Sequence, residues 1–275
     1  MNVLRRMAVA ALALAVLAYA AYAALFYTAQ RQLLFPLADT VRHPFRTALT
    51  TPAQLVEPTV SFGHARGVFL PAAATPAPAL LFFHGNGETI DQHLDTLAAL
   101  NTLGLNVFLL ELPGYAGADG APTFDSLVEA STAAYDWLAQ DSRVDKRKIV
   151  AFGRSIGGAP AAELSRHRPL AALVLLSTFA STADLARDHF LPPFLALDPF
   201  DSAARIREFS GAVLLMHGDN DEVIPAAHAR RMAGASPRAQ LHTEPCGHND
   251  CRYFGAALLP LLRTFLQAHQ VLPTP

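Results

Sequence analysis

Residues Gly153 to Gly157 (Gly-Arg-Ser-Ile-Gly) have the G-x-S-x-G spacing that places a serine on a sharp turn between a strand and a helix. An apolar run, 148–152, precedes the motif, and an amphipathic stretch, 156–167, follows it. Such a turn lifts the serine hydroxyl clear of the sheet, and the helix N-terminus favours negative charge developing beside it. The motif therefore predicts Ser155 as a nucleophile. The alternative is an ordinary serine cap in a glycine-rich turn.

A nucleophilic serine needs a general base, for which histidine is the usual side chain. His248 follows the last expected strand, 240–243, and is the only one of the 11 histidines in that late loop. We therefore expect His248 to be the base. His167 and His228 fall on amphipathic stretches and are expected on helix surfaces, and His84 is expected to be a structural loop residue.

The base in turn needs an acid to orient it, and a loop before His248 offers three carboxylates. This loop, 217–225, reads His-Gly-Asp-Asn-Asp-Glu-Val-Ile-Pro. We expect Asp221 to be the acid, with Asp219 as the alternative. Asp198 and Asp201 would supply it only in a rearranged triad.

An oxyanion formed by serine attack needs two preorganised backbone N–H donors. The residue after the nucleophile, Ile156, is expected to supply one. The second is expected from the loop after the apolar run 79–83, which reads His-Gly-Asn-Gly and lets the backbone approach a substrate closely. We expect the Asn86 N–H there, with Gly87 as the alternative.

The elements that position these residues follow a regular alternation of short apolar runs and amphipathic stretches. Expected strands are 59–62, 67–70, 79–83, 106–110, 148–152, 172–176, 212–216 and 240–243, and expected helices are 89–103, 123–140, 156–167, 225–234 and 252–269. This order predicts an α/β fold with a mainly parallel sheet and helices on both faces. In such sheets ligands bind at the carboxyl ends of the strands, where the candidate residues fall.

The N-terminal segment 7–27 is 21 residues long and carries no charge. At 1.5 Å per residue it would span about 31 Å, the thickness of a bilayer core. Arg5 and Arg6 precede it, which favours a cytoplasmic N-terminus and a catalytic domain on the non-cytoplasmic side. The alternative is a signal peptide cleaved near Ala23, followed by secretion.

The chain therefore divides into four expected parts: a basic segment 1–6, a transmembrane anchor 7–27, a connector 28–53 and a catalytic domain 54–275. The formal net charge of −2 and the scattered arginines exclude a nucleic-acid-binding stripe. The sequence has no zinc-ligand spacing, dinucleotide fingerprint or P-loop, so no cofactor or metal is expected. Cys246 and Cys251 flank His248 and are expected either as a disulfide or as two unpaired thiols.

Four motifs in order resemble those of the α/β-hydrolase superfamily: HGNG, GRSIGG, HGDNDEVIP and CGHND. More narrowly, the chain resembles small membrane-anchored bacterial hydrolases related to serine aminopeptidases and lipase-like enzymes. The resemblance covers roughly residues 54–270. In that pattern Ser155, Asp221 and His248 match the triad, and Asn86 and Ile156 match the oxyanion hole.

Two departures from the family pattern bear on the substrate. Glu88 stands where many relatives continue with glycine, which predicts a charge at the mouth of the oxyanion loop. Residues 112–115, Leu-Pro-Gly-Tyr, replace an Arg-Gly-Tyr-Gly run, which predicts an altered substrate entrance.

The expected activity is serine hydrolysis of carboxylic esters or thioesters with small to medium acyl groups, through an acyl-enzyme. Segment 180–207 contains apolar residues and prolines and is the expected small lid, with core packing as the alternative. The alternatives to this activity are an acyltransferase, a peptidase or amidase on the same triad, and a catalytically silent membrane scaffold. Expected partners are a small acyl substrate and the membrane, and the protein is expected to be a monomer.

Overall fold

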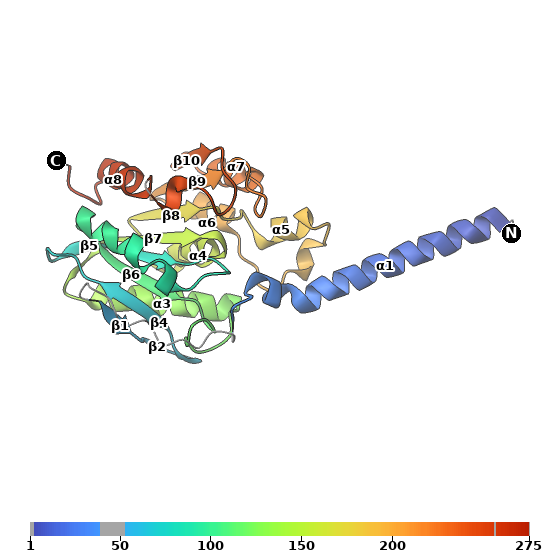
Figure 1. The fold of residues 1–275 in the computed structure, drawn as a ribbon, viewed down its shortest axis with the longest axis horizontal. Helices are drawn as coiled ribbons and strands as arrows, with labels where there is room; N and C mark the ends of the chain where they lie inside the picture. The colour runs from blue at the N-terminus through green and yellow to red at the C-terminus, as the bar shows by residue number, and fades with distance from the viewer. Residues whose placement is uncertain (1–2, 39–52, 256, 275) are drawn as a thin grey trace.

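The short apolar runs of this chain pair into one sheet whose central strands are parallel (Figure 1). A computed structural model describes residues 3–38, 53–255 and 257–274. Sheet order is β1-β4-β6-β5-β7-β8-β9-β10, with β1 and β4 antiparallel to their neighbours. The strands are β1 (Gln54–Val56), β4 (Arg66–Leu70), β5 (Ala77–Phe83), β6 (Asn106–Glu111), β7 (Val144–Arg154), β8 (Ala172–Leu176), β9 (Ala212–Gly218) and β10 (Ala239–Glu244).

Helices cover both faces of this sheet. The helices that follow the first strand are α2 (Leu94–Ala98), α3 (Phe124–Gln140), α4 (Gly158–His167), α5 (Thr182–Asp188), α6 (Ser202–Glu208), α7 (Ala227–Ala233) and α8 (Leu258–Ala268), and α1 (Val3–Leu34) precedes the sheet. Short 3₁₀ segments are η1 (Ile90–Gln92), η2 (Ala99–Leu103), η3 (Ser155–Gly157), η4 (Pro193–Leu195) and η5 (Arg252–Phe254). The predicted α/β architecture is confirmed.

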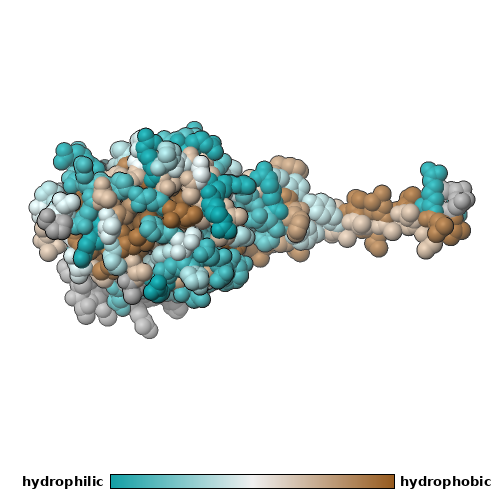
Figure 2. Space-filling view, turned by 90° about the horizontal axis from the view of Figure 1, so that it is seen from above, coloured by the Kyte–Doolittle hydropathy of each residue, from teal (hydrophilic) through white to brown (hydrophobic). Residues whose placement is uncertain are grey.

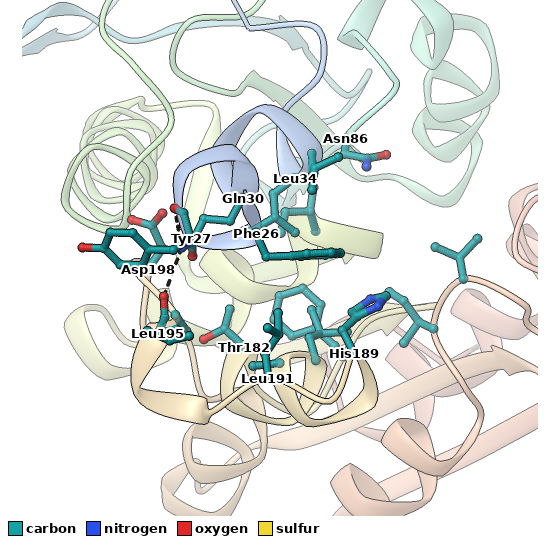
Figure 3. A pocket seen from close by; sticks show the side chains of 18 of the residues that line it. Phe26, Tyr27, Gln30, Leu34, Asn86, Thr182, His189, Leu191, Leu195 and Asp198 are labelled. Carbon is teal, nitrogen blue, oxygen red and sulfur yellow. Dashed lines mark hydrogen bonds between the residues drawn. The ribbon is translucent and has the colours of Figure 1, made fainter. Parts of the chain in front are cut away.

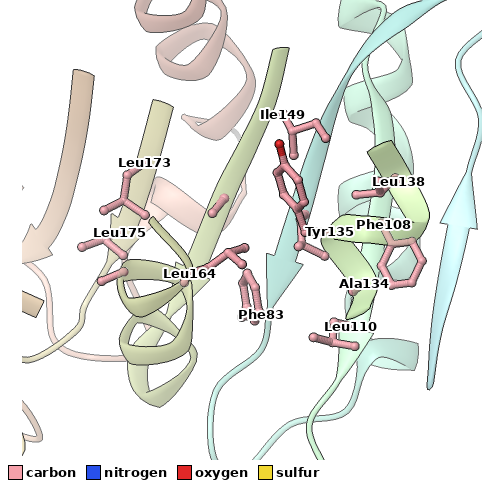
Figure 4. Packing of buried hydrophobic residues seen from close by; sticks show 14 of the residues in the cluster. Phe83, Phe108, Leu110, Ala134, Tyr135, Leu138, Ile149, Leu164, Leu173 and Leu175 are labelled. Carbon is pink, nitrogen blue, oxygen red and sulfur yellow. The ribbon is translucent and has the colours of Figure 1, made fainter. Parts of the chain in front are cut away.

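The apolar side chains of the central strands form a core on each face of the sheet, because successive side chains of a strand point to opposite sides. In β5, Leu81 and Phe83 join the cluster beneath α3 and α4, while Leu80 and Phe82 join the cluster beneath α2 and α8. Figure 4 shows the first cluster, with Tyr135 of α3 lying between the strands and the helix layer. Burial on both faces explains why these runs are nearly continuous in apolar residues.

Some elements differ from the expected ones. The first expected strand, 59–62, is instead β2 (Thr59–Val60), which pairs with β3 (Gly63–His64) in a separate two-stranded sheet. The three-residue edge strand β1 was not predicted, because so short a run gives no periodic signal.

Two expected helices are interrupted. Stretch 89–103 divides into η1, α2 and η2, and in its first turn the Ile90 N–H donates to the Glu111 carboxylate. Stretch 252–269 divides into η5 and α8, because the backbone of Gly255 leaves the helical conformation (φ −151°, ψ −127°).

Helix α1 projects from the sheet domain and is long and apolar enough to cross a membrane (Figure 1). It continues through 28–34, which the sequence assigned to the connector, because this end packs on the domain. There Arg31 pairs with the buried Asp198 (Nε to Oδ2, 3.0 Å), and Phe35 just beyond is buried. Residues 39–52 of the expected connector lie outside the described residues.

The turn that joins β7 to α4 is tight enough to require glycine. A methyl group on Gly153 would meet the backbone of Gly157 and Gly158, and one on Gly157 would meet the carbonyl groups of Phe83 and His84. Strand β5 therefore lies directly against the turn, and neither backbone can yield without moving the sheet.

We expect Gly153→Ala to lower the free energy of unfolding by about 2 kcal/mol or more, since overpacking commonly costs about 1–3 kcal/mol and the clash here is with backbone. The matched control is Gly234→Ala, whose added methyl group would stand 3.5 Å from its nearest neighbour. The control should stay within about 0.5 kcal/mol of the wild type. Denaturant unfolding of the detergent-solubilised chain measures both, and equal midpoints would contradict the packing described.

Candidate active site

Ser155 sits at the turn between β7 and α4, at the carboxyl end of the central strand. Its φ of +51° lies in the left-handed region, which costs energy for a residue with a side chain. The Thr178 hydroxyl, just beyond β8, donates to the Ser155 carbonyl oxygen at 2.7 Å. The neighbouring strand thus fixes the turn, and the serine is 5% exposed.

The structure brings His248 and Asp221 to Ser155 from two separate loops. His248 Nε2 lies 3.0 Å from Ser155 Oγ, and His248 Nδ1 lies 2.8 Å from Asp221 Oδ2. With the ring proton on Nδ1, His248 donates to the carboxylate and can accept the serine proton on Nε2. These are the contacts that a nucleophile, a base and an orienting acid require.

Asp221 is held as a carboxylate by its surroundings. Burial alone would raise its pKa, but hydrogen bonds from His217, His248 and the Ile224 N–H hold the pKa well below its usual range. His217 lies beneath it, with Nε2 2.8 Å from the Ile224 carbonyl oxygen and 3.3 Å from Asp221 Oδ2. Sequence reasoning did not single out His217, although it stands four residues before the expected acid.

The alternative carboxylates lie elsewhere. Asp219 is exposed. Asp198 is paired with Arg31, and Asp201 caps α6 by accepting from the Ala204 N–H.

Among the histidines, the expected surface position of His228 is wrong. It is 4% exposed, because the Ala180 N–H donates to its Nδ1 and its Nε2 lies 2.6 Å from Asp188 of α5.

The loop after β5 carries the second expected oxyanion donor. Asn86 and Ile156 both line the cavity that contains Ser155. The buried Tyr115 hydroxyl donates to the Asn86 carbonyl oxygen at 2.8 Å, and burial raises the pKa of this phenol. Tyr115 therefore orients the 86–87 peptide, a role that the sequence did not reveal because 29 residues separate the partners. His84 is fully buried, and its Nε2 accepts from the Leu112 N–H at 3.0 Å.

The charge expected from Glu88 at the mouth of this loop is compensated. Glu88 forms an ion pair with the guanidinium of Arg154, the residue before the nucleophile, and accepts from the Gly85 N–H at 2.8 Å. His93 Nε2 lies 2.9 Å from the same carboxylate. Burial, together with the nearby His84, lowers the pKa of His93 to about 4, so its neutral ring donates to Glu88 at pH 7.

Arg154 also contacts the loop that carries His248. Its Nη2 donates to the Asn249 side-chain oxygen at 2.8 Å. One buried side chain thus connects the turn of the nucleophile, the oxyanion loop and the histidine loop. The sequence offered no signal for this role, since Arg154 occupies the variable position of the motif.

Cys246 and Cys251 are joined by a disulfide that closes the loop around His248, with Cα atoms 5.2 Å apart. Of the two expected states, the structure has the bonded one. Asp250 lies near both sulfurs. Bonded sulfurs are not the thiolates that bind metals, so this group does not form a metal site.

A cavity of about 390 Å³ opens above Ser155. It lies between α1 and the 180–207 segment, which holds α5 and η4 (Figure 3). Phe26 and Leu34 of α1 face Leu191 and His189 across it. In the segment expected as a lid, Leu191 and Leu195 line the cavity rather than the core of the sheet.

The chain is similar in sequence to several known proteins. The family model of serine aminopeptidases, S33, matches residues 74–198. An uncharacterised protein of Mycobacterium tuberculosis is 37% identical over 201 residues, which are 71% of this chain and 72% of that protein. An α/β-hydrolase domain-containing protein of Caenorhabditis elegans is 34% identical over 68% of this chain. The match spans 57% of the length of the C. elegans protein.

Two solved esterase structures share the fold. The Pyrococcus furiosus esterase Pf2001 superposes with a TM-score of 0.68 at 16% identity, over 83% of this chain and 97% of that one. The propionate-bound Thermogutta terrifontis esterase Est2 superposes with a TM-score of 0.62 at 20% identity, over 84% and 99%. The family model and the sequence relatives, together with this shared fold and the motif order already described, show that the chain belongs to the α/β-hydrolase superfamily.

Proposed function

We propose that this protein is a serine hydrolase that cleaves carboxylic ester or thioester bonds through an acyl-enzyme on Ser155. The observation that carries the proposal is the continuous chain of contacts from Ser155 Oγ to His248 Nε2 at 3.0 Å and from His248 Nδ1 to Asp221 at 2.8 Å. This series of contacts ends at Ser155, which lines a cavity that can hold a substrate. A protein that acts only as a scaffold would not need such a series of contacts.

In the proposed mechanism, Ser155 Oγ attacks the acyl carbon while its proton moves to His248 Nε2. Asp221, whose pKa is held low, stabilises the resulting imidazolium. The N–H groups of Ile156 and Asn86 are the proposed donors to the oxyanion. His248 then gives its proton to the leaving alcohol or thiol. Water, deprotonated by His248, attacks the acyl-enzyme and releases the acid and the free serine.

The cavity favours an apolar acyl group. Its walls include Phe26, Leu34, Phe179, Leu191 and Ile224. Its volume of about 390 Å³ lies at the low end of ligand sites, consistent with small to medium acyl chains. Two fold relatives are esterases, one with propionate bound, which supports ester chemistry, while the serine aminopeptidase family model keeps a peptidase or amidase as the alternative. Acyl transfer to another alcohol or amine would use the same acyl-enzyme.

We further propose that the catalytic domain lies on the non-cytoplasmic side of a membrane that α1 crosses. Arg5 and Arg6 at the start of α1 favour a cytoplasmic N-terminus. The Cys246–Cys251 disulfide suits an oxidising compartment.

The nucleophile is tested first with a fluorophosphonate probe on the detergent-solubilised protein. We expect a single adduct on Ser155, located by peptide mass spectrometry. Ser155→Ala and His248→Ala should each lower turnover of p-nitrophenyl butyrate by about 10⁶, because residues that act as a unit lose nearly the whole effect together. The matched control is Ser165→Ala on α4, which should keep the rate. A Ser155→Ala protein that retains most of its esterase rate would exclude the proposed mechanism.

Asp221→Asn should lower turnover by about 10⁴ while leaving the fold intact. It should also change the pH dependence of stability. The pKa of Asp221 in the folded protein lies below its value of about 3.9 in the unfolded chain. The ionised carboxylate therefore stabilises the fold above about pH 4, and this stabilisation is lost as the pH falls further. Urea unfolding should show the wild type more stable than the variant at pH 7, with the gap narrowing below about pH 4. A gap that widens on acidification would contradict the low pKa.

Membranes carrying the protein provide a test of its compartment. Under denaturing, non-reducing conditions we expect no free thiol, because both cysteines are bonded. Two free thiols per chain in protein taken directly from membranes would place the domain in a reducing compartment.

A further inference from the structure

We propose that the active site takes its acyl substrate from the lipid bilayer, by a path between α1 and the lid tip, defined here as residues 189–195. The substrate class is an ester or thioester whose acyl chain resides in the membrane. This inference rests on the proposed hydrolase function and adds where the substrate comes from and which surface receives it.

The end of α1 forms part of the active site. Tyr22, Phe26, Gln30 and Leu34 recur every four residues, so they share one face of the helix, and all four are half-buried on a helix that is mostly exposed. Phe26, Gln30 and Leu34 line the same cavity as Ser155 (Figure 3). An apolar helix of membrane-spanning length thus supplies one wall of the site.

Hydrogen bonds hold this helix against the lid. The Gln30 side chain donates to the Leu195 carbonyl oxygen at 3.0 Å and accepts from the Leu197 N–H at 2.9 Å. The Arg31–Asp198 pair lies on the same side, and the Asp198 carboxylate also accepts from the Phe124 N–H. The direction of α1 relative to the site is therefore fixed, and with it the position of the site relative to the membrane.

The lid tip reaches a part of α1 that lies within the apolar segment 7–27. The Tyr19 hydroxyl donates to the Phe190 carbonyl oxygen at 2.9 Å, and the Tyr22 hydroxyl donates to the His189 carbonyl oxygen at 2.7 Å. Tyrosine is enriched at the lipid headgroup level, so the two tyrosines that bond to the lid tip favour a position of the lid tip at the membrane surface.

The lid tip presents two large apolar side chains outward. Phe190 and Phe194 are each 83% exposed and do not line the cavity. The backbone of Phe190 accepts from Tyr19 of α1, and the projecting half of α1 is mostly hydrophobic (Figure 2). Aromatic side chains on a surface that adjoins a membrane helix are suited to burial in the interface.

Together these contacts describe a continuous apolar route. Lipid meets Phe190 and Phe194 at the lid tip, and the adjoining cavity runs between α1 and the lid down to Ser155. An acyl chain can leave the bilayer along this route without its apolar part crossing water. The partially exposed Tyr27 and Leu33 of α1 also line the cavity.

The same contacts bear on the fate of the N-terminus. Cleavage after Ala23 would remove Tyr19 and Tyr22, and with them both hydrogen bonds to the lid tip. It would leave Phe26 and Gln30 on a short chain end without a membrane segment to fix it. The proposed route therefore requires that α1 is retained as an anchor.

The first test asks whether the lid tip touches lipid and does not depend on activity. The chain has one tryptophan, Trp137, which packs against Phe69 and Phe108 within the domain. We introduce Phe190→Trp and reconstitute both proteins in phosphatidylcholine vesicles with brominated acyl chains. Fluorescence of the variant should be quenched well beyond that of the wild type. Equal quenching would place the lid tip in water and overturn the proposal.

The second test compares two substrates in the reconstituted protein: water-soluble p-nitrophenyl butyrate, and p-nitrophenyl decanoate, a medium-chain ester carried in the vesicle bilayer. Phe190→Ser/Phe194→Ser should lower the rate on the decanoate ester by about tenfold, because two phenyl rings lose their lipid contact. The rate on butyrate should stay within about twofold, as for a surface change. The matched control is Leu55→Ser, an exposed apolar residue on β1 at the far edge of the sheet.

The outcomes separate the two proposals. A wild type that cleaves butyrate but not decanoate in the bilayer, or a double variant that loses both rates equally or neither, overturns the membrane route and leaves the hydrolase intact. A wild type that cleaves neither ester and takes no probe on Ser155 overturns the proposed function. The quenching measurement then still decides where the lid tip lies.

Discussion

The arrangement of this site depends on the close approach of the β7–α4 turn to β5. Gly153 and Gly157 have no room for a side chain, since a methyl group on either would meet backbone of the turn or of the neighbouring strand. That contact forces Ser155 into a left-handed conformation at the carboxyl end of the sheet. The cost of the conformation is offset by the surrounding packing, including the Thr178 hydrogen bond to the serine carbonyl. Every other group of the site is positioned relative to this turn.

Buried polar contacts then hold three loops around the serine. Arg154 connects the turn to Glu88 on one side and to Asn249 on the other, while Tyr115 fixes the 86–87 peptide. A disulfide closes the histidine loop from its outer side. Because each of these groups is buried or bonded, the loops keep their spacing without help from a substrate. This kind of preorganisation is what electrostatic stabilisation of an oxyanion requires.

The same site extends into the N-terminal helix. In a sequence diagram α1 is a separate anchor, yet its last turns line the cavity and its tyrosines bond to the lid. The end of α1 and segment 180–207 therefore form one structural unit. If the lid tip lies at the membrane surface, as we propose, the helix both locates the enzyme and shapes the passage to its nucleophile.

The sequence by itself determined the fold class, the apolar helix and the candidate residues Ser155, Asp221 and His248. Short apolar runs and the glycines of a tight turn are visible within a few residues of each position, and the motifs that contain these residues follow one another in a fixed order along the chain. Only the tertiary structure decided which cysteine state holds, that His228 is buried under the lid, and that Tyr115, His217 and Arg154 support the site. It also decided that the end of α1 belongs to the cavity. The physical reason is the separation of these partners along the sequence. Gln30 and Leu195, for example, stand 165 residues apart. A contact that forms only when the sheet brings distant loops together leaves no local sequence pattern.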